Sequence, residues 1–169
     1  GSAAARHLAE AGVPTTVISS PEHPPAGRVA GPRASHYDQG RIVHRGGSDP
    51  VMAEARSVSM GRFGEVAARS GVDFLTSRAL VTLTPDPEAE VALSRAHGAE
   101  VEIWSLAALA DRYGIAPPAA FDGGMVVESA RTAGFVNPRL LVEAQLRLAV
   151  ASGAIVVADP AVRVSLSGD

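Results

Sequence analysis

The sequence predicts an α/β fold with an added α+β part. Short β-branched or apolar runs alternate with segments rich in helix-forming residues, which is the mixed order expected of that class. Glycines follow three of the helical segments, at Gly12, Gly71 and Gly153, where helices commonly end. No internal repeat or low-complexity tract interrupts this order. The 169 residues suffice for one domain, or one and a part, with a real core.

Capping signals bound most of the expected helices. A helix over 2–11 is rich in good helix formers, Asp49-Pro50 opens one to residue 70, and Asn137-Pro138 opens one to residue 152. Two shorter helices are expected over 89–97 and 106–113. The apolar stripe of the 49–70 helix is expected at Val51, Ala55, Val58, Phe63 and Val66. The buried side of the 137–152 helix is expected at Leu140, Leu141, Ala144, Leu148 and Val150.

The expected strands are short. The β-branched run 15–18 reads as a buried strand, and further strands are expected over 80–83, 101–104, 125–127, 155–157 and 162–164. The proline-rich segment after residue 18 is expected to be loop as far as residue 42. Trp104 and Phe135 are expected to be core residues rather than parts of a substrate site.

Composition excludes several function classes. The chain holds 15 basic residues, all arginine, against 18 acidic ones, and this net charge of −3 argues against nucleic acid as the main partner. The absence of cysteine removes thiol nucleophiles and thiolate zinc sites, and the absence of lysine removes Walker-type phosphate loops and Schiff-base chemistry. The spacing of His23, His36 and His44 matches no zinc pattern, so no metal is expected. With no 18-residue apolar run and no signal-peptide pattern, a cytoplasmic location without membrane contact is expected.

The first 18 residues fit the second half of a dinucleotide-binding fingerprint. In that fingerprint a strand leads through Gly-x-Gly-x-x-Gly into a helix and then a second strand. Here Gly1 and Ser2 precede a run of alanines, and the next strand ends at Ile18. The first strand and first two glycines are expected before residue 1. The second strand is followed by Ser19 and Ser20 rather than the usual acidic ribose ligand. The other interpretation is an ordinary alanine-rich surface helix.

A motif further along carries a family resemblance. The segment 34–45 reads Ala-Ser-His-Tyr-Asp-Gln-Gly-Arg-Ile-Val-His-Arg, followed by Gly-Gly-Ser-Asp-Pro, and 134–141 reads Gly-Phe-Val-Asn-Pro-Arg-Leu-Leu. In this order and spacing, the segments resemble the D-amino-acid-oxidase-like family of FAD-dependent oxidoreductases, with the sarcosine oxidase and N-methyl amino acid oxidase branch the most similar. The resemblance spans essentially the whole chain. The loop departs from the family pattern by one extra residue, so that the family's second arginine falls on His44.

The resemblance implies a partial Rossmann-like FAD-binding domain, a βαβ unit without its first strand, and part of an α+β substrate domain. By residues, 1–75 and 136–169 would belong to the FAD-binding domain and 76–135 to the substrate domain. The implied cofactor-binding residues are Gly1, Ser2, Ser19, Ser20, Ala34, Ser35, His36, Gly40, Arg41, Ile42 and Val162. Arg41 and His44 are the candidate catalytic residues.

The implied activity is oxidation of a small amine or amino acid by hydride transfer to FAD, with oxygen as the usual electron acceptor. The chain would be roughly the first half of such an enzyme. One alternative is a non-catalytic remnant, or one component of a split flavoprotein that binds FAD only with a partner. A weaker alternative is a nicotinamide-binding Rossmann protein, which would have no use for the 34–45 loop. The sequence does not specify an oligomeric state.

Overall fold

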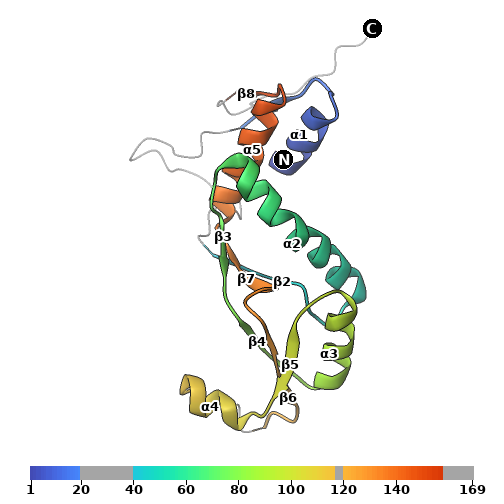
Figure 1. The fold of residues 1–169 in the computed structure, drawn as a ribbon, viewed down its shortest axis with the longest axis vertical. Coiled ribbons are helices and arrows are strands. Elements are labelled where there is room, and N and C mark those ends of the chain that lie inside the picture. Colours follow the sequence, from blue (N-terminus) through green and yellow to red (C-terminus); the bar gives the residue numbers. More distant parts are fainter. Residues whose placement is uncertain (20–39, 117–119, 158–169) are drawn as a thin grey trace. The chain divides into compact units, whose positions relative to one another are not determined.

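The computed structural model describes residues 1–19, 40–116 and 120–157, which form two compact units (Figure 1). Unit 1 comprises 1–39, 66–74 and 137–169, and unit 2 comprises 40–65 and 75–136. The sequence-based domain boundaries at 75 and 136 lie close to those of the units, but residues 40–65 group with the second unit. Five of the predicted cofactor-binding residues lie outside the described residues: Ser20, Ala34, Ser35, His36 and Val162.

Unit 1 is built from a parallel strand pair and two packed helices. Strand β1 (Thr16–Ile18) pairs in parallel with β8 (Ile155–Val157), with Thr16 opposite Ile155. Helix α1 (Ser2–Glu10) lies beside α5 (Pro138–Ala151), as Figure 1 shows. Their contact is made of small residues, since the core cluster here is Ala5, Ala9, Ala149 and Ala154. Alanines allow the two helix backbones to approach closely.

Unit 2 contains two antiparallel three-stranded sheets. One has the order β2–β7–β3, from β2 (Arg41–His44), β7 (Ala133–Val136) and β3 (Leu75–Ser77). The other has the order β4–β6–β5, from β4 (Leu80–Thr84), β6 (Gly124–Glu128) and β5 (Val101–Trp104). Helices α3 (Pro87–Ala96) and α4 (Ala107–Tyr113) belong to this unit, as does most of α2 (Pro50–Ser70). Its cores gather around Met125 and Val126, which are 0% and 3% exposed.

The structure confirms the predicted α/β class and all five predicted helices, but corrects several strands. Residues 41 and 42 belong to a strand rather than a loop, and β3 and β7 were not expected at all. Both are short, and β7 begins Ala133-Gly134, so neither shows the alternation on which strand prediction depends. A Cβ at Gly134 would lie in contact with the Thr76 carbonyl oxygen, so only glycine permits this close strand approach.

Burial differs from the predicted stripes. On α2, Val66 is buried as expected, but Val51 and Val58 are 77% and 49% exposed, and Ala53, which was not expected on the stripe, is buried. On α5, Ala144 and Leu148 are buried as expected, but Val150 is exposed. Alanines thus form much of the buried faces beside Val66 and Leu148, and a search for large apolar residues overlooks Ala53 and Ala149. Phe135 is also exposed, while Trp104 packs partly buried against the Met125 cluster as expected.

Strand β1 was expected to be buried, and it is not. Ile18 is 56% exposed, and all three residues of β8 are exposed as well. In the part of the chain that the structure describes, no helix is long and apolar enough to cross a membrane.

Candidate functional site

The first turn of α1 is open to an anionic group. Ala5 N donates to the Gly1 carbonyl, so the N–H groups of residues 2–4 have no acceptor within the helix. No side chain caps this end and the first turn holds no acidic residue. Such N–H groups, together with the helix dipole, favour a phosphate or carboxylate. A Cβ at Gly1 would meet nothing within 4 Å, so the structure gives no packing reason for this glycine.

The carboxyl ends of β1 and β8 lie at one edge of the parallel pair. Helix α1 directly precedes β1 in the chain and contacts both β1 and α5 within unit 1. Ser19 immediately follows β1, is exposed, and donates its N–H to the Val157 carbonyl at 3.1 Å. Unit 1 therefore holds three predicted residues: Gly1 and Ser2 at the start of α1, and Ser19 at the carboxyl end of β1, the edge at which nucleotides bind to parallel sheets.

The remaining described candidates lie along β2 in unit 2. Arg41 pairs with Val136, Ile42 with Phe135 and His44 with Ala133, and a Cβ at Gly40 would lie 3.9 Å from Cδ2 of Phe135. Because side chains alternate along a strand, Ile42 and His44 share one face and Arg41 occupies the other. The two predicted catalytic side chains thus leave β2 in opposite directions.

A buried carboxylate, which the sequence did not single out, organises the turn after β2. Glu128 is 4% exposed and ends β6. Its Oε1 accepts from Arg45 N at 2.9 Å and its Oε2 from Gly46 N at 3.1 Å, while His44 Nδ1 lies 3.5 Å from Oε2. Burial by itself raises the pKa of Glu128, but the contacts with His44, Arg45 N, Thr132 and Gly46 N outweigh it and lower that pKa below the ordinary 4.5. The carboxylate is therefore ionised at neutral pH.

Two further groups fix the same turn. Arg56 of α2 donates from Nη1 to the Gly46 carbonyl at 2.8 Å, and Gly47 N donates to Ser94 Oγ at 3.1 Å. A Cβ at Gly46 would lie 2.8 Å from both Glu128 Oε2 and Ser94 Oγ, so only glycine fits between them. The backbone N–H groups of Arg45, Gly46 and Gly47 and the Gly46 carbonyl thus have defined partners, whereas the buried Nε of Arg45 has none.

A cavity of about 340 Å³ lies between β2 and α2 within unit 2. Its wall is mostly apolar, with polar groups from His44, Arg56 and Ser59. The residues lining it are Ile42, Val43, His44, Met52, Ala55, Arg56, Ser59, Met60 and Phe63. An apolar wall with a few polar groups is typical of small-molecule sites.

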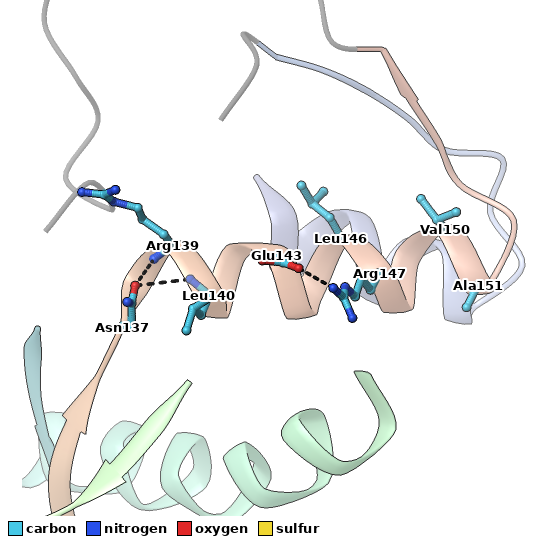
Figure 2. A pocket seen from close by; sticks show the side chains of 8 residues that line it. All are labelled: Asn137, Arg139, Leu140, Glu143, Leu146, Arg147, Val150 and Ala151. Carbon is cyan, nitrogen blue, oxygen red and sulfur yellow. Dashed lines mark hydrogen bonds and ion pairs between the residues drawn. The ribbon is translucent and has the colours of Figure 1, made fainter. Parts of the chain in front are cut away.

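A larger groove of about 800 Å³ follows the outer face of α5, and Figure 2 shows its lining side chains. Asn137 Oδ1 caps the helix by accepting from the N–H groups of Arg139 and Leu140, and Glu143 pairs with Arg147 at 2.6 Å. The side chains of Asn137, Glu143 and Arg147 thus serve the helix itself. We therefore do not place a candidate site in this groove, although it is larger. Two separate candidates remain, α1 with β1 in unit 1 and β2 with its cavity in unit 2.

The comparisons with known proteins identify the family and the fold. A family model described as "FAD dependent oxidoreductase" matches residues 1–169, so the chain belongs to that FAD-dependent family, as the sequence predicted. No curated protein matches the chain.

Solved structures show the same fold. The chain resembles the Tyr258Phe mutant of NikD, described as an unusual amino acid oxidase essential for nikkomycin biosynthesis (TM-score 0.62, 15% identity, 92% of this chain and 39% of that one). It also resembles L-proline dehydrogenase from P. horikoshii (0.62, 14%, 92% and 40%) and glycine oxidase from Bacillus cereus ATCC 14579 (0.58, 16%, 92% and 42%). The chain thus spans about two fifths of the length of these proteins. The sarcosine oxidase branch remains a prediction.

Proposed function

We propose that this chain supplies part of an FAD-dependent oxidoreductase that oxidises a small amine or amino acid by hydride transfer to the flavin, with unit 1 holding the nucleotide part of FAD. The observation that carries the proposal is the uncapped first turn of α1, in the same unit as a parallel strand pair that α1 contacts. The described relatives act on amino acids, which favours that substrate class. Two of them are oxidases, which favours oxygen as the electron acceptor.

The residues divide the binding task between them. The N–H groups of residues 2–4 would receive the pyrophosphate, and the Ser19 hydroxyl would hydrogen-bond a ribose hydroxyl. For Gly40, Arg41 and Ile42, which belong to unit 2, the cofactor-binding roles remain predictions from the family resemblance. When bound, FAD supplies the hydride acceptor that these side chains cannot provide. His44 faces the β2–α2 cavity, where we place the amine substrate.

The roles of Ser20, Ala34, Ser35, His36 and Val162 remain predictions from the family resemblance. They lie outside the described residues, so the proposed function does not depend on them.

A second candidate rests on the exposed strand pair of unit 1. Parallel strands are normally covered on both faces, but Ile18 and Ile155 are 56% and 61% exposed. This exposure supports a split-flavoprotein component or remnant that binds FAD only when another polypeptide segment covers the sheet. The nicotinamide alternative is set aside, because the family to which the chain belongs is FAD dependent.

An FAD titration of the purified chain, followed by quenching of flavin fluorescence, tests the proposal. Ala3 is exposed in the first turn of α1, so Ala3→Glu and Ala3→Gln differ only in charge at that end. The glutamate should weaken FAD binding by about tenfold or more through repulsion of the pyrophosphate. The same glutamate should stabilise α1 by about 0.3–1 kcal/mol through the helix dipole.

Opposite signs for binding and stability are the diagnostic result, because a merely misfolded variant would lose both. Equal FAD affinity for the two variants would place the pyrophosphate elsewhere. A folded wild-type chain that leaves flavin fluorescence unquenched at every FAD concentration would overturn independent binding and favour the split component.

A further inference from the structure

The contact between His44 and Glu128 carries an inference that goes beyond cofactor binding. His44 ends β2, and Glu128 ends β6, which belongs to the other sheet of unit 2. The Glu128 side chain is 5% exposed and the His44 side chain 22%, so the carboxylate is shielded while the imidazole reaches the cavity. The pair thus joins a buried carboxylate to a partly exposed imidazole.

We infer that Glu128 is a positioning residue for His44, holding the imidazole with its proton on Nδ1 and leaving Nε2 as the acceptor presented to the β2–α2 cavity. Only the identity of the cavity's occupant rests on the proposed function. The tautomer itself follows from the donors and acceptors within unit 2.

The hydrogen-bond count around the carboxylate supports this assignment. Oε1 and Oε2 already accept from Arg45 N and Gly46 N, so Glu128 is fixed in place before His44 is considered. A carboxylate that is ionised at neutral pH offers acceptors only. His44 Nδ1, 3.5 Å from Oε2, must therefore carry the proton if the two are to attract each other.

The polar groups that line the cavity indicate which atom could accept a hydrogen bond from a ligand. Arg56 also lines it, but its Nη1 donates to the Gly46 carbonyl, and a guanidinium has no acceptor to offer. Nε2 of a neutral His44 is therefore the ring nitrogen positioned to accept from an N–H or O–H of a cavity ligand, such as the ammonium of an amine. If a proton moves from that ammonium to Nε2, the amine becomes neutral and the imidazolium is stabilised by Glu128 through Nδ1–H.

The chain contains a matched control pair. His97 Nδ1 lies 3.0 Å from Glu54 Oε2, but the Glu54 side chain is 66% exposed and the pair does not line the cavity. Glu128→Gln therefore removes the charge of a buried carboxylate beside His44. Glu54→Gln removes the charge of an exposed carboxylate beside His97.

Nitrogen-15 NMR of the imidazoles, in the full chain at alkaline pH and without flavin, tests the inference. We expect the wild-type chain to show His44 as the Nδ1–H tautomer. In Glu128→Gln an amide N–H₂ replaces one acceptor, so His44 should change to mainly Nε2–H while His97 keeps its signals. Glu54→Gln should leave His44 unchanged.

An Nε2–H tautomer of His44 in the wild-type chain would overturn the inference, whether or not the variant folds. An unchanged tautomer in folded Glu128→Gln would overturn it as well. Because no flavin is present, the outcome is independent of the FAD titration, and failure of one proposal is distinguishable from failure of the other.

Discussion

The two units of this chain differ in how they bury apolar side chains and pair polar groups. In unit 2, Met125 is fully buried, and the backbone N–H groups of the turn after β2 donate to the buried Glu128 carboxylate and to Ser94 Oγ. In unit 1, the helices meet through alanines, while Ile18, Ile155 and Val157 expose 56%, 61% and 40% of their surface. Ile42 and Val51 of unit 2 are 68% and 77% exposed as well, so the difference lies in the buried cores: unit 2 buries large side chains around Met125, whereas the core cluster of unit 1 consists of alanines. Because parallel strands are normally covered on both faces, we propose that a bound nucleotide or a covering segment stabilises the strand pair of unit 1.

Truncating one large apolar side chain in each unit tests the difference between their cores most directly. Met125→Ala should destabilise the chain by about 2–5 kcal/mol, because it opens a cavity in a closed core. Ile155→Ala should change stability by no more than about 0.5 kcal/mol, because that side chain is mostly exposed. Urea denaturation of both variants measures the contrast. A comparable loss for Ile155→Ala would show that the unit 1 sheet is covered in solution.

Two glycine substitutions test how tightly the turn after β2 is packed. Gly46→Ala places a methyl group 2.8 Å from Glu128 Oε2 and Ser94 Oγ, so we expect a loss of about 1–3 kcal/mol. Gly61 lies in α2 with nothing within 4 Å of its Cβ position, so Gly61→Ala should stabilise by about 1 kcal/mol. Thermal unfolding followed by circular dichroism should give shifts of opposite sign. Two shifts of the same sign would contradict the predicted packing around Gly46.

The pH dependence of stability tests the buried carboxylate, with the smallest expected effect. The folded-state pKa of Glu128 lies below 4.5, so its contribution is present above the unfolded value and is lost as pH falls through the folded one. The effect is small because burial opposes the stabilising contacts. Between about pH 6 and about pH 3, the stability difference between wild type and Glu128→Gln should therefore shrink. A difference that stays constant would show that the ionised form is not favoured on folding.

Sequence reasoning located the helices well because their signals are local. Asn137 followed by Pro138 predicts a capped helix start, and the structure shows the Asn137 side chain accepting from residues 139 and 140. Strands β3 and β7 escaped prediction because their existence depends on pairing between distant segments. The close approach of Gly134 to Thr76 is a tertiary fact with no local pattern.

The candidate site divides in the same way. Arg41 and His44 were singled out because they stand in a motif, but Glu128 was not, because its contact with Arg45 joins residues 83 positions apart. A glutamate that directly follows the apolar run 125–127 was the available signal, since a strand end of that kind buries its last residue. That Arg41 and His44 face opposite sides likewise could not be predicted, because residues 41 and 42 were expected to be loop.

Amide hydrogen exchange with and without saturating FAD tests the central claim, that unit 1 holds the nucleotide, most directly. We predict that FAD slows exchange in the first turn of α1 and in β1 and β8, while the β4–β6–β5 sheet of unit 2 exchanges at an unchanged rate. Protection confined to that sheet, or unchanged exchange throughout unit 1 despite measured FAD binding, would contradict the account.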